Sequence, residues 1–146
     1  MTYGTFNNRK IAFQCSDDFD IINMNSDGYI VRLGNNASGA VINVAVGEYQ
    51  GDSLEDICSR TVTDFGNQGL KVLSSNVTKK FGKKVVAINY LQVHEGVNVL
   101  RKSLGFVVGN DFFTFEYVTV EGQSLSKDEE AFRIAIESLE VNKGYY

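Results

Sequence analysis

Residues 70–120 hold four β-rich segments joined by very short connectors, and this arrangement limits the fold more than any other feature of the chain. The connectors KKFGKK, HEG and GN each contain glycine, as hairpin loops commonly do. We therefore predict an antiparallel meander over this half of the chain. Its strands are expected at 70–78, 84–93, 97–108 and 111–120.

The N-terminal part of the chain also carries strand patterns. The sequence contains no proline, so element boundaries must be inferred from glycine, asparagine and periodicity. Ile11 and Phe13 alternate with other residues as in a half-buried strand. Asp27-Gly28 is a strong hairpin signal because both residues tolerate positive φ. The predicted strands are 10–15, 20–25, 28–34 and 39–49.

Two amphipathic helices interrupt and follow the strands, each with apolar residues at helical spacing. The first is expected to begin in DSLEDI, with Asp52 as N-cap and Glu55 as its capping-box partner, and to end at FGNQG. The second is expected from Ser126, with Ser126 as N-cap and Glu129 as partner. The string SLEV closes this helix, and NKGYY is expected to be a frayed tail.

The totals fit one domain over residues 1–146, with 43% hydrophobic and 22% charged residues. An antiparallel sheet and two amphipathic helices bury their apolar faces by packing on each other. We predict an α+β fold: a twisted antiparallel sheet packed with two helices in a layered α/β/α-type arrangement.

Charge and hydropathy exclude some classes of partner. A net charge of -4 argues against nucleic acid, whose phosphates need clustered lysine and arginine. No apolar run approaches the ~20 residues that span a bilayer. The default expectation is a cytoplasmic protein, although removal of a leader would leave the same sequence.

Three features resemble the PsbP/Mog-like family. The string FQCSDDF is similar to the family's opening strand, which often ends in Phe-x-x-Pro-x-x-Trp: Phe13 matches, while Ser16 replaces the proline and Phe19 the tryptophan. The long meander and the closing helix EEAFRIAIESLEV are similar too, so the resemblance covers nearly the whole chain. It implies a PsbP/Mog-like fold that acts as a binding platform or assembly factor, without a shared catalytic centre.

His94 is the only histidine, and Glu95 follows it directly. Within a strand the two side chains would point to opposite faces, and in a turn both would be solvated, so neither arrangement makes an acid/base pair. An enzyme would have to combine His94 with Cys15 or Cys58 in a thiol–histidine centre. The cysteines lack C-x-x-C spacing, and two buried free thiols are expected, with one disulfide as the alternative.

Metal and anion sites have little support in the sequence. Asp17, Asp18 and Asp20 offer oxygen ligands of the kind that Ca²⁺ prefers, but SDDFD lacks the spacing and glycine of an EF-hand loop. Acidic residues between two strands commonly form turns instead. The lysines of KKFGKK suit either an anion-binding loop or a solvated turn, and the turn is the simpler interpretation. No cofactor motif is present, so neither a cofactor nor a metal is expected.

The two faces of the meander differ in chemistry. Alternate aromatic residues of FFTFEY share an apolar face that is expected to lie under the helices. Glu116 has the opposite parity, as does Arg101 on the preceding strand, so their face is expected to meet solvent or a partner. Tyr90 is predicted to line a groove or to cover the core. Tyr90, Arg101 and Glu116 are the candidate ligand or partner surface.

These observations favour a non-enzymatic binding or assembly-type domain that engages a protein or a small ligand through its sheet or loop surface. One alternative is a small enzyme with the cysteine–histidine centre named above. Another is a structural subunit whose edge strand pairs with a copy of itself, which would give a homodimer.

Overall fold

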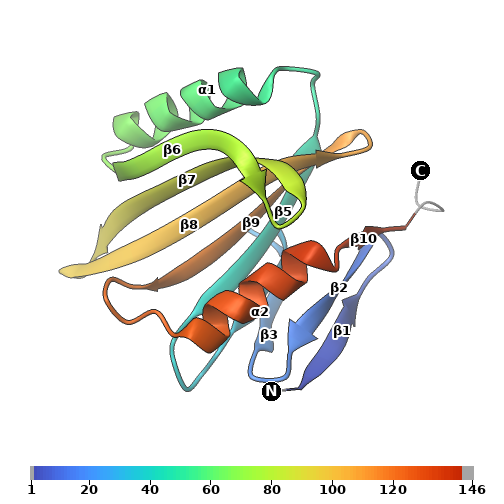
Figure 1. The fold of residues 1–146 in the computed structure, drawn as a ribbon. Coiled ribbons are helices and arrows are strands. Elements are labelled where there is room, and N and C mark those ends of the chain that lie inside the picture. The colour runs from blue at the N-terminus through green and yellow to red at the C-terminus, as the bar shows by residue number, and fades with distance from the viewer. Residues whose placement is uncertain (1, 143–146) are drawn as a thin grey trace.

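The computed structural model describes residues 2–142, which fold into two antiparallel sheets and two helices (Figure 1). The strands are β1 (Tyr3–Asn7), β2 (Ile11–Ser16), β3 (Asp20–Ser26), β4 (Tyr29–Gly34), β5 (Val41–Glu48), β6 (Lys71–Lys80), β7 (Lys83–His94), β8 (Val97–Val108), β9 (Asp111–Val120) and β10 (Glu140–Val141). The helices are α1 (Leu54–Asn67) and α2 (Ser126–Glu137). The expected α+β architecture is confirmed.

The larger sheet has seven strands in the order β3-β4-β5-β9-β8-β7-β6. Strands β6 to β9 form the predicted antiparallel meander. Three hairpins of the seven-stranded sheet turn through a pair of residues with positive φ, as type I′ turns require. These pairs are Asp27-Gly28, Phe81-Gly82 and Glu95-Gly96. The string KKFGKK is therefore mostly strand, because only two of its residues form the turn.

A second, three-stranded sheet in the order β1-β2-β10 was not expected. The prediction that the helix runs into residues 138–141 is wrong, since α2 ends at Glu137 and β10 pairs with β2. Ser138 explains the change of direction: its Oγ donates to the carbonyl of Ile134 at 2.6 Å and accepts from the backbone N–H of Gln14 at 2.7 Å. The predicted tail NKGYY extends beyond the described residues after Asn142.

Both predicted helix caps are wrong by one residue. Ser53, not Asp52, caps α1, because its Oγ accepts from the N–H of Asp56, and Asp52 instead pairs with Arg60 at 2.7 Å.

Ser126 lies inside α2, and the capping position belongs to Leu125, whose side chain makes no capping bond. The buried carboxylate of Asp128 in the first turn accepts a hydrogen bond from Asn35 at 2.9 Å, which ties the helix start to the β4–β5 loop.

The two faces of the large sheet are buried by different elements. The α2 face, defined by Val44, Phe113 and Phe115, packs against α2 and the small sheet, and all three side chains are fully buried. The α1 face, defined by Val86, Ile88 and Tyr90, packs against α1. Figure 1 shows α1 above β6 and β7, with α2 across the other side of the sheet.

Candidate functional site

Helix α1 covers only the β6–β7 end of its face and leaves an apolar strip uncovered. Residues that oppose each other across antiparallel strands have side chains on the same face. By this register the strip extends from the edge strand β3 to the first residues of β8. None of its members belongs to the buried cluster on either face of the sheet. We call the following residues the apolar strip: Ile22, Val41, Val97, Val99, Val118 and Val120.

Exposure within the strip is high for branched aliphatic residues. Ile22 is 53% exposed, Val97 43% and Val120 37%. Ile22 lies over Gly34, where an added Cβ would come within 2.7 Å of its Cδ1. The strip is thus continuous from β3 across β5 and β9 to β8, and it is available to a partner.

A hydrogen-bonded network borders the strip and joins the three residues that the sequence singled out. Arg101 opposes Val118 on one side and Tyr90 on the other. Its guanidinium donates to Glu116 Oε1 at 2.6 Å and to Gln92 Oε1 at 2.9 Å. The Tyr90 hydroxyl donates to Glu116 Oε2 at 2.5 Å. Both carboxylate oxygens of Glu116 therefore have a partner.

The three residues of the network are less exposed than their positions in the strand alternation suggested. Glu116 is only 7% exposed and Tyr90 only 6%, whereas Arg101 is half-buried. Tyr90 is covered by Phe65 of α1, with ring centroids 4.4 Å apart. Arg101 is therefore the member of the three that reaches the surface, and the other two hold it there.

Burial raises the pKa of Tyr90, and the negative charge of Glu116 and the hydrogen bond to it raise that pKa further. The phenol consequently keeps its proton at any physiological pH and acts as a permanent donor. A fixed donor on one carboxylate oxygen leaves the other oxygen to orient Arg101.

A second polar group lies beside the strip on β4 and β5. Arg32 donates to Asn43 Oδ1 at 3.0 Å, and its guanidinium lies 5.3 Å from the ring centroid of Tyr29. Asn43 is only 1% exposed, yet its Nδ2 has no hydrogen-bond partner within residues 2–142, and neither has Asn23 Oδ1. Buried amide atoms without partners are uncommon and costly.

The structure separates His94 from Cys58. The start of α1 lies beside the start of β7, where Glu55 pairs with Lys84. Near the end of the helix, Phe65 packs on Tyr90, which lies further along β7. Helix and strand therefore run in the same direction. Cys58 lies about 10 Å before Phe65 along the helix, and His94 lies about 13 Å beyond Tyr90 along the strand. His94 itself is exposed next to the turn, opposite Val97.

Cys15 lies in the small sheet, where its Sγ donates to the carbonyl of Ser16 at 3.5 Å. Both cysteines are free, but the prediction that both are buried is wrong for Cys15, since only Cys58 is buried and Cys15 is half-buried. Burial, followed by the negative charges of Asp17 and Asp20, raises the pKa of the Cys15 thiol to about 11. A nucleophilic cysteine needs the opposite shift, because the thiolate is the reactive form.

We expect native Cys15 to react with iodoacetamide at pH 8 at least about tenfold more slowly than an ordinary thiol, because little of it is thiolate and the greater nucleophilicity of that thiolate offsets only part of the loss. Mass spectrometry of a Cys58→Ala variant would follow this one thiol. The same variant unfolded in urea is the control and should react at the ordinary rate. Equal rates in the native and unfolded protein would contradict the raised pKa.

Asp17 and Asp18, which precede β3, already contact other side chains. Asp17 accepts from the Thr2 hydroxyl at 2.5 Å, and Asp18 lies 3.8 Å from Lys127. Asp20 is the first residue of β3. Over residues 2–142 no group of three His, Cys, Asp or Glu side chains is placed to hold a metal ion. Nor does any helix in that range have the length and apolar content to cross a membrane.

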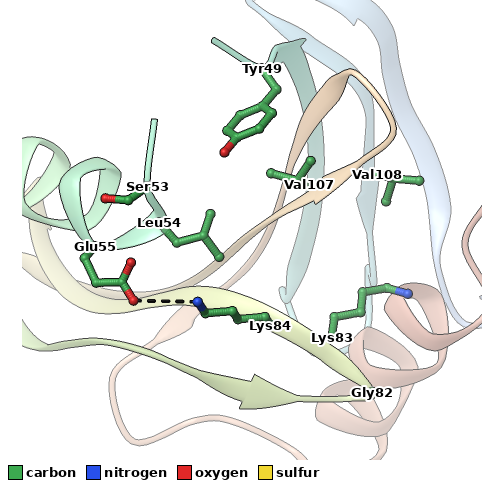
Figure 2. Close-up of a pocket in the computed structure, with 9 residues that line it drawn as sticks. All are labelled: Tyr49, Ser53, Leu54, Glu55, Gly82, Lys83, Lys84, Val107 and Val108. Atoms are coloured by element: carbon green, nitrogen blue, oxygen red, sulfur yellow. Dashed lines mark ion pairs between the residues drawn. The ribbon is translucent and has the colours of Figure 1, made fainter. Parts of the chain in front are cut away.

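A hollow of about 580 Å³ lies at the start of α1, where Figure 2 shows Lys83 and Lys84 at the start of β7. Lys84 already pairs with Glu55 at 3.7 Å, and Lys83 Nζ is directed to the Phe106 ring, 5.5 Å from its centroid. The Ser53 hydroxyl caps the helix. This hollow therefore gives little support to the anion-binding interpretation of KKFGKK.

No protein-family model matches the chain, and no curated protein matches it in sequence. Solved structures match it closely in shape. The cyanobacterial PsbP of Synechocystis aligns over 96% of this chain and 92% of its own, with 14% identity and a TM-score of 0.64. The fold is PsbP/Mog-like.

Two other structures support this assignment. A variant of the protein Mog1 aligns over 99% of both chains, with 10% identity and a TM-score of 0.66. A protein from Bacteroides thetaiotaomicron gives a TM-score of 0.67 with 13% identity. The chain is 93% covered in that alignment but spans only 46% of the Bacteroides protein. At such identities the PsbP/Mog-like likeness shows the fold alone.

Sequence reasoning named Tyr90, Arg101 and Glu116 as a candidate surface, but it predicted neither their hydrogen bonds to one another nor the strip beside them. Val118 and Val120 have the same parity as Glu116, so extending the alternation along β9 would have found them. The contribution of Arg32 and Asn43 depends on the β4–β5–β9 pairing, which no local pattern in a PsbP/Mog-like chain reveals.

Proposed function

We propose that this protein is a non-catalytic binding domain that docks a protein partner on the apolar strip. The observation that carries the proposal is a strip of half-exposed aliphatic side chains that belongs to neither core. Its border is a pre-arranged Arg101–Glu116–Tyr90 network. Protein interfaces commonly combine an apolar centre with arginine anchors, and Arg101 is the member of the network that reaches the surface.

The charges around the strip indicate the chemistry of the partner. Glu116 is buried and neutralised by Arg101, and Arg32 has no acidic partner within residues 2–142. Of Arg32, Arg101 and Glu116, only Arg32 therefore keeps a charge that no carboxylate of the described chain offsets. An apolar surface flanked by carboxylates would complement the strip in shape and Arg32 in charge.

Self-association through an edge strand has weaker support. The edge strand β6 carries Lys71, Lys79 and Lys80 and a register shift, features that protect an edge from pairing. The other edge strand, β3, also shifts register and contains Asn25 at φ 50°. Neither edge of the seven-stranded sheet is flat, so we favour a different protein over a second copy paired along this sheet.

The enzyme alternative depends on His94, which lies at the outer end of the strip and far from Cys58. The raised pKa of Cys15 disfavours a nucleophilic role for the second thiol. The proposed docking function needs neither a cofactor nor a metal.

Val120→Asp is expected to weaken partner binding about thirtyfold or more, because it places an unpaired carboxylate in a desolvated apolar contact worth at least ~2 kcal/mol. The measurement is quantitative affinity capture from the source organism, comparing each captured protein between wild type and variant. Val120 is exposed, so folding should be preserved, and circular dichroism checks this.

Leu73→Asp is the matched control, since Leu73 is 46% exposed on β6 and lies outside the strip. The proposal requires capture by this variant to equal that of wild type. Docking of a different protein on the strip would be excluded if Val120→Asp captured the same partners as wild type. It would also be excluded if the wild-type protein captured only further copies of itself.

A further inference from the structure

A second hollow, of about 240 Å³, lies on the α2 face between α2 and strands β6 to β8, on the opposite side of the sheet from the apolar strip. It forms where α2 packs on β9 and β2 and leaves the outer strands of this face uncovered. Its volume is below the roughly 300–1,000 Å³ of pockets for drug-sized ligands. A smaller molecule would therefore fill it.

One wall of this pocket is a row of neutral polar side chains. Ser74, Asn76 and Thr78 occupy alternate positions of β6, and Asn89 opposes Ser74 on β7, so all four have the same orientation. No hydrogen bond described for residues 2–142 engages any of these four side chains. They present unused donors and acceptors to one small volume.

The floor of the pocket is apolar. Leu104, Tyr117 and Phe132 are all buried, and the rings of Tyr117 and Phe132 lie 5.8 Å apart. The Tyr117 hydroxyl is occupied by Ser124 at 2.9 Å, so this residue contributes its ring face rather than its polar end. Small-molecule sites usually combine apolar and aromatic side chains with a few polar groups that fix the orientation of the ligand, and this pocket has both.

The charges at the rim do not favour an anionic ligand. Lys102 pairs with Glu129 at 2.8 Å, and Lys80 Nζ lies 5.5 Å from the Phe81 ring centroid. The wall side chains without a protein partner are neutral, and Lys80 is the one charged rim residue without a carboxylate partner in the described residues. We propose that this pocket binds a neutral polyhydroxylated molecule of monosaccharide size, with hydroxyls on the β6 wall and a C–H face on the rings.

This proposal is independent of protein docking on the other face, so either can fail alone. The test is NMR titration of the folded protein with glucose, galactose, mannose and myo-inositol, and separately with acetate as a probe for anions. At least one polyol is expected to shift the amide signals of residues 74–80 and 87–89 saturably, with a dissociation constant in the millimolar range or tighter. Acetate should not.

The double variant Thr78→Val with Asn89→Leu keeps the shape of the wall and removes two hydrogen-bonding groups. It should weaken binding about tenfold or more, and its unchanged amide spectrum elsewhere would show that it folds. Ser75→Ala is the matched control, because Ser75 opposes Ile88 and faces α1. No saturable binding of any polyol, saturation of the same signals by acetate, or wild-type affinity in the double variant would overturn the proposal.

Discussion

Replacing Glu116 by alanine is expected to lower the free energy of unfolding by about 3–5 kcal/mol, the range for removing one partner of a buried ion pair. The variant leaves the Arg101 guanidinium without its carboxylate in a site where the two side chains are 22% and 10% exposed. It also leaves the Tyr90 hydroxyl without an acceptor. Urea denaturation of wild type and variant measures the difference.

Two controls separate loss of the network from loss of a charge. Glu121 is an exposed carboxylate whose hydrogen bond to Asn98 is 3.3 Å long, and Glu121→Ala should change stability by less than ~0.5 kcal/mol. The double variant Glu116→Leu with Arg101→Leu should recover most of the loss, because it leaves no buried charge unpaired. A Glu116→Ala effect as small as that of Glu121→Ala would show that the network is solvent-screened.

Phe115→Ala is expected to cost about 3–5 kcal/mol of unfolding free energy, because it leaves a cavity where the two sheets meet. The Phe115 ring is fully buried, 5.8 Å from the Phe13 ring of the small sheet and 5.7 Å from Phe106 of β8. Calorimetric or denaturant unfolding gives the value.

The matched control is Leu73→Ala, which removes an exposed aliphatic side chain from the same sheet and should cost under ~0.5 kcal/mol. A cost for Phe115→Ala below ~1 kcal/mol would mean that the small sheet does not depend on this contact.

The elements that sequence patterns located correctly are those with long alternation and glycine turns. β7, β8 and β9 each run for ten residues or more, and each of their turns contains a glycine at positive φ. β1 buries only Phe6, and β10 contains two residues, so neither has a periodicity to detect. Both strands exist because β2 supplies a partner from a distant part of the chain.

The candidate site was only partly predictable for a similar reason. Parity along a strand placed Arg101 and Glu116 on one face, but their contact depends on the β8–β9 register, and the burial of Glu116 depends on its neighbours across the sheet. The pocket beside Asn89 depends on how far α2 reaches across the α2 face. The position of a helix on a sheet is set by tertiary packing, which local sequence does not encode.

The most direct test of the docking proposal is site-specific photocrosslinking in a lysate of the source organism. A photoreactive amino acid at position 120, within the apolar strip, is compared with the same amino acid at position 73, which lies outside the strip and is somewhat more exposed. We predict a discrete crosslink to a different protein from position 120 and none from position 73. Equal crosslinking from both positions, or crosslinks from position 120 only to a second copy of the chain, would contradict the proposal.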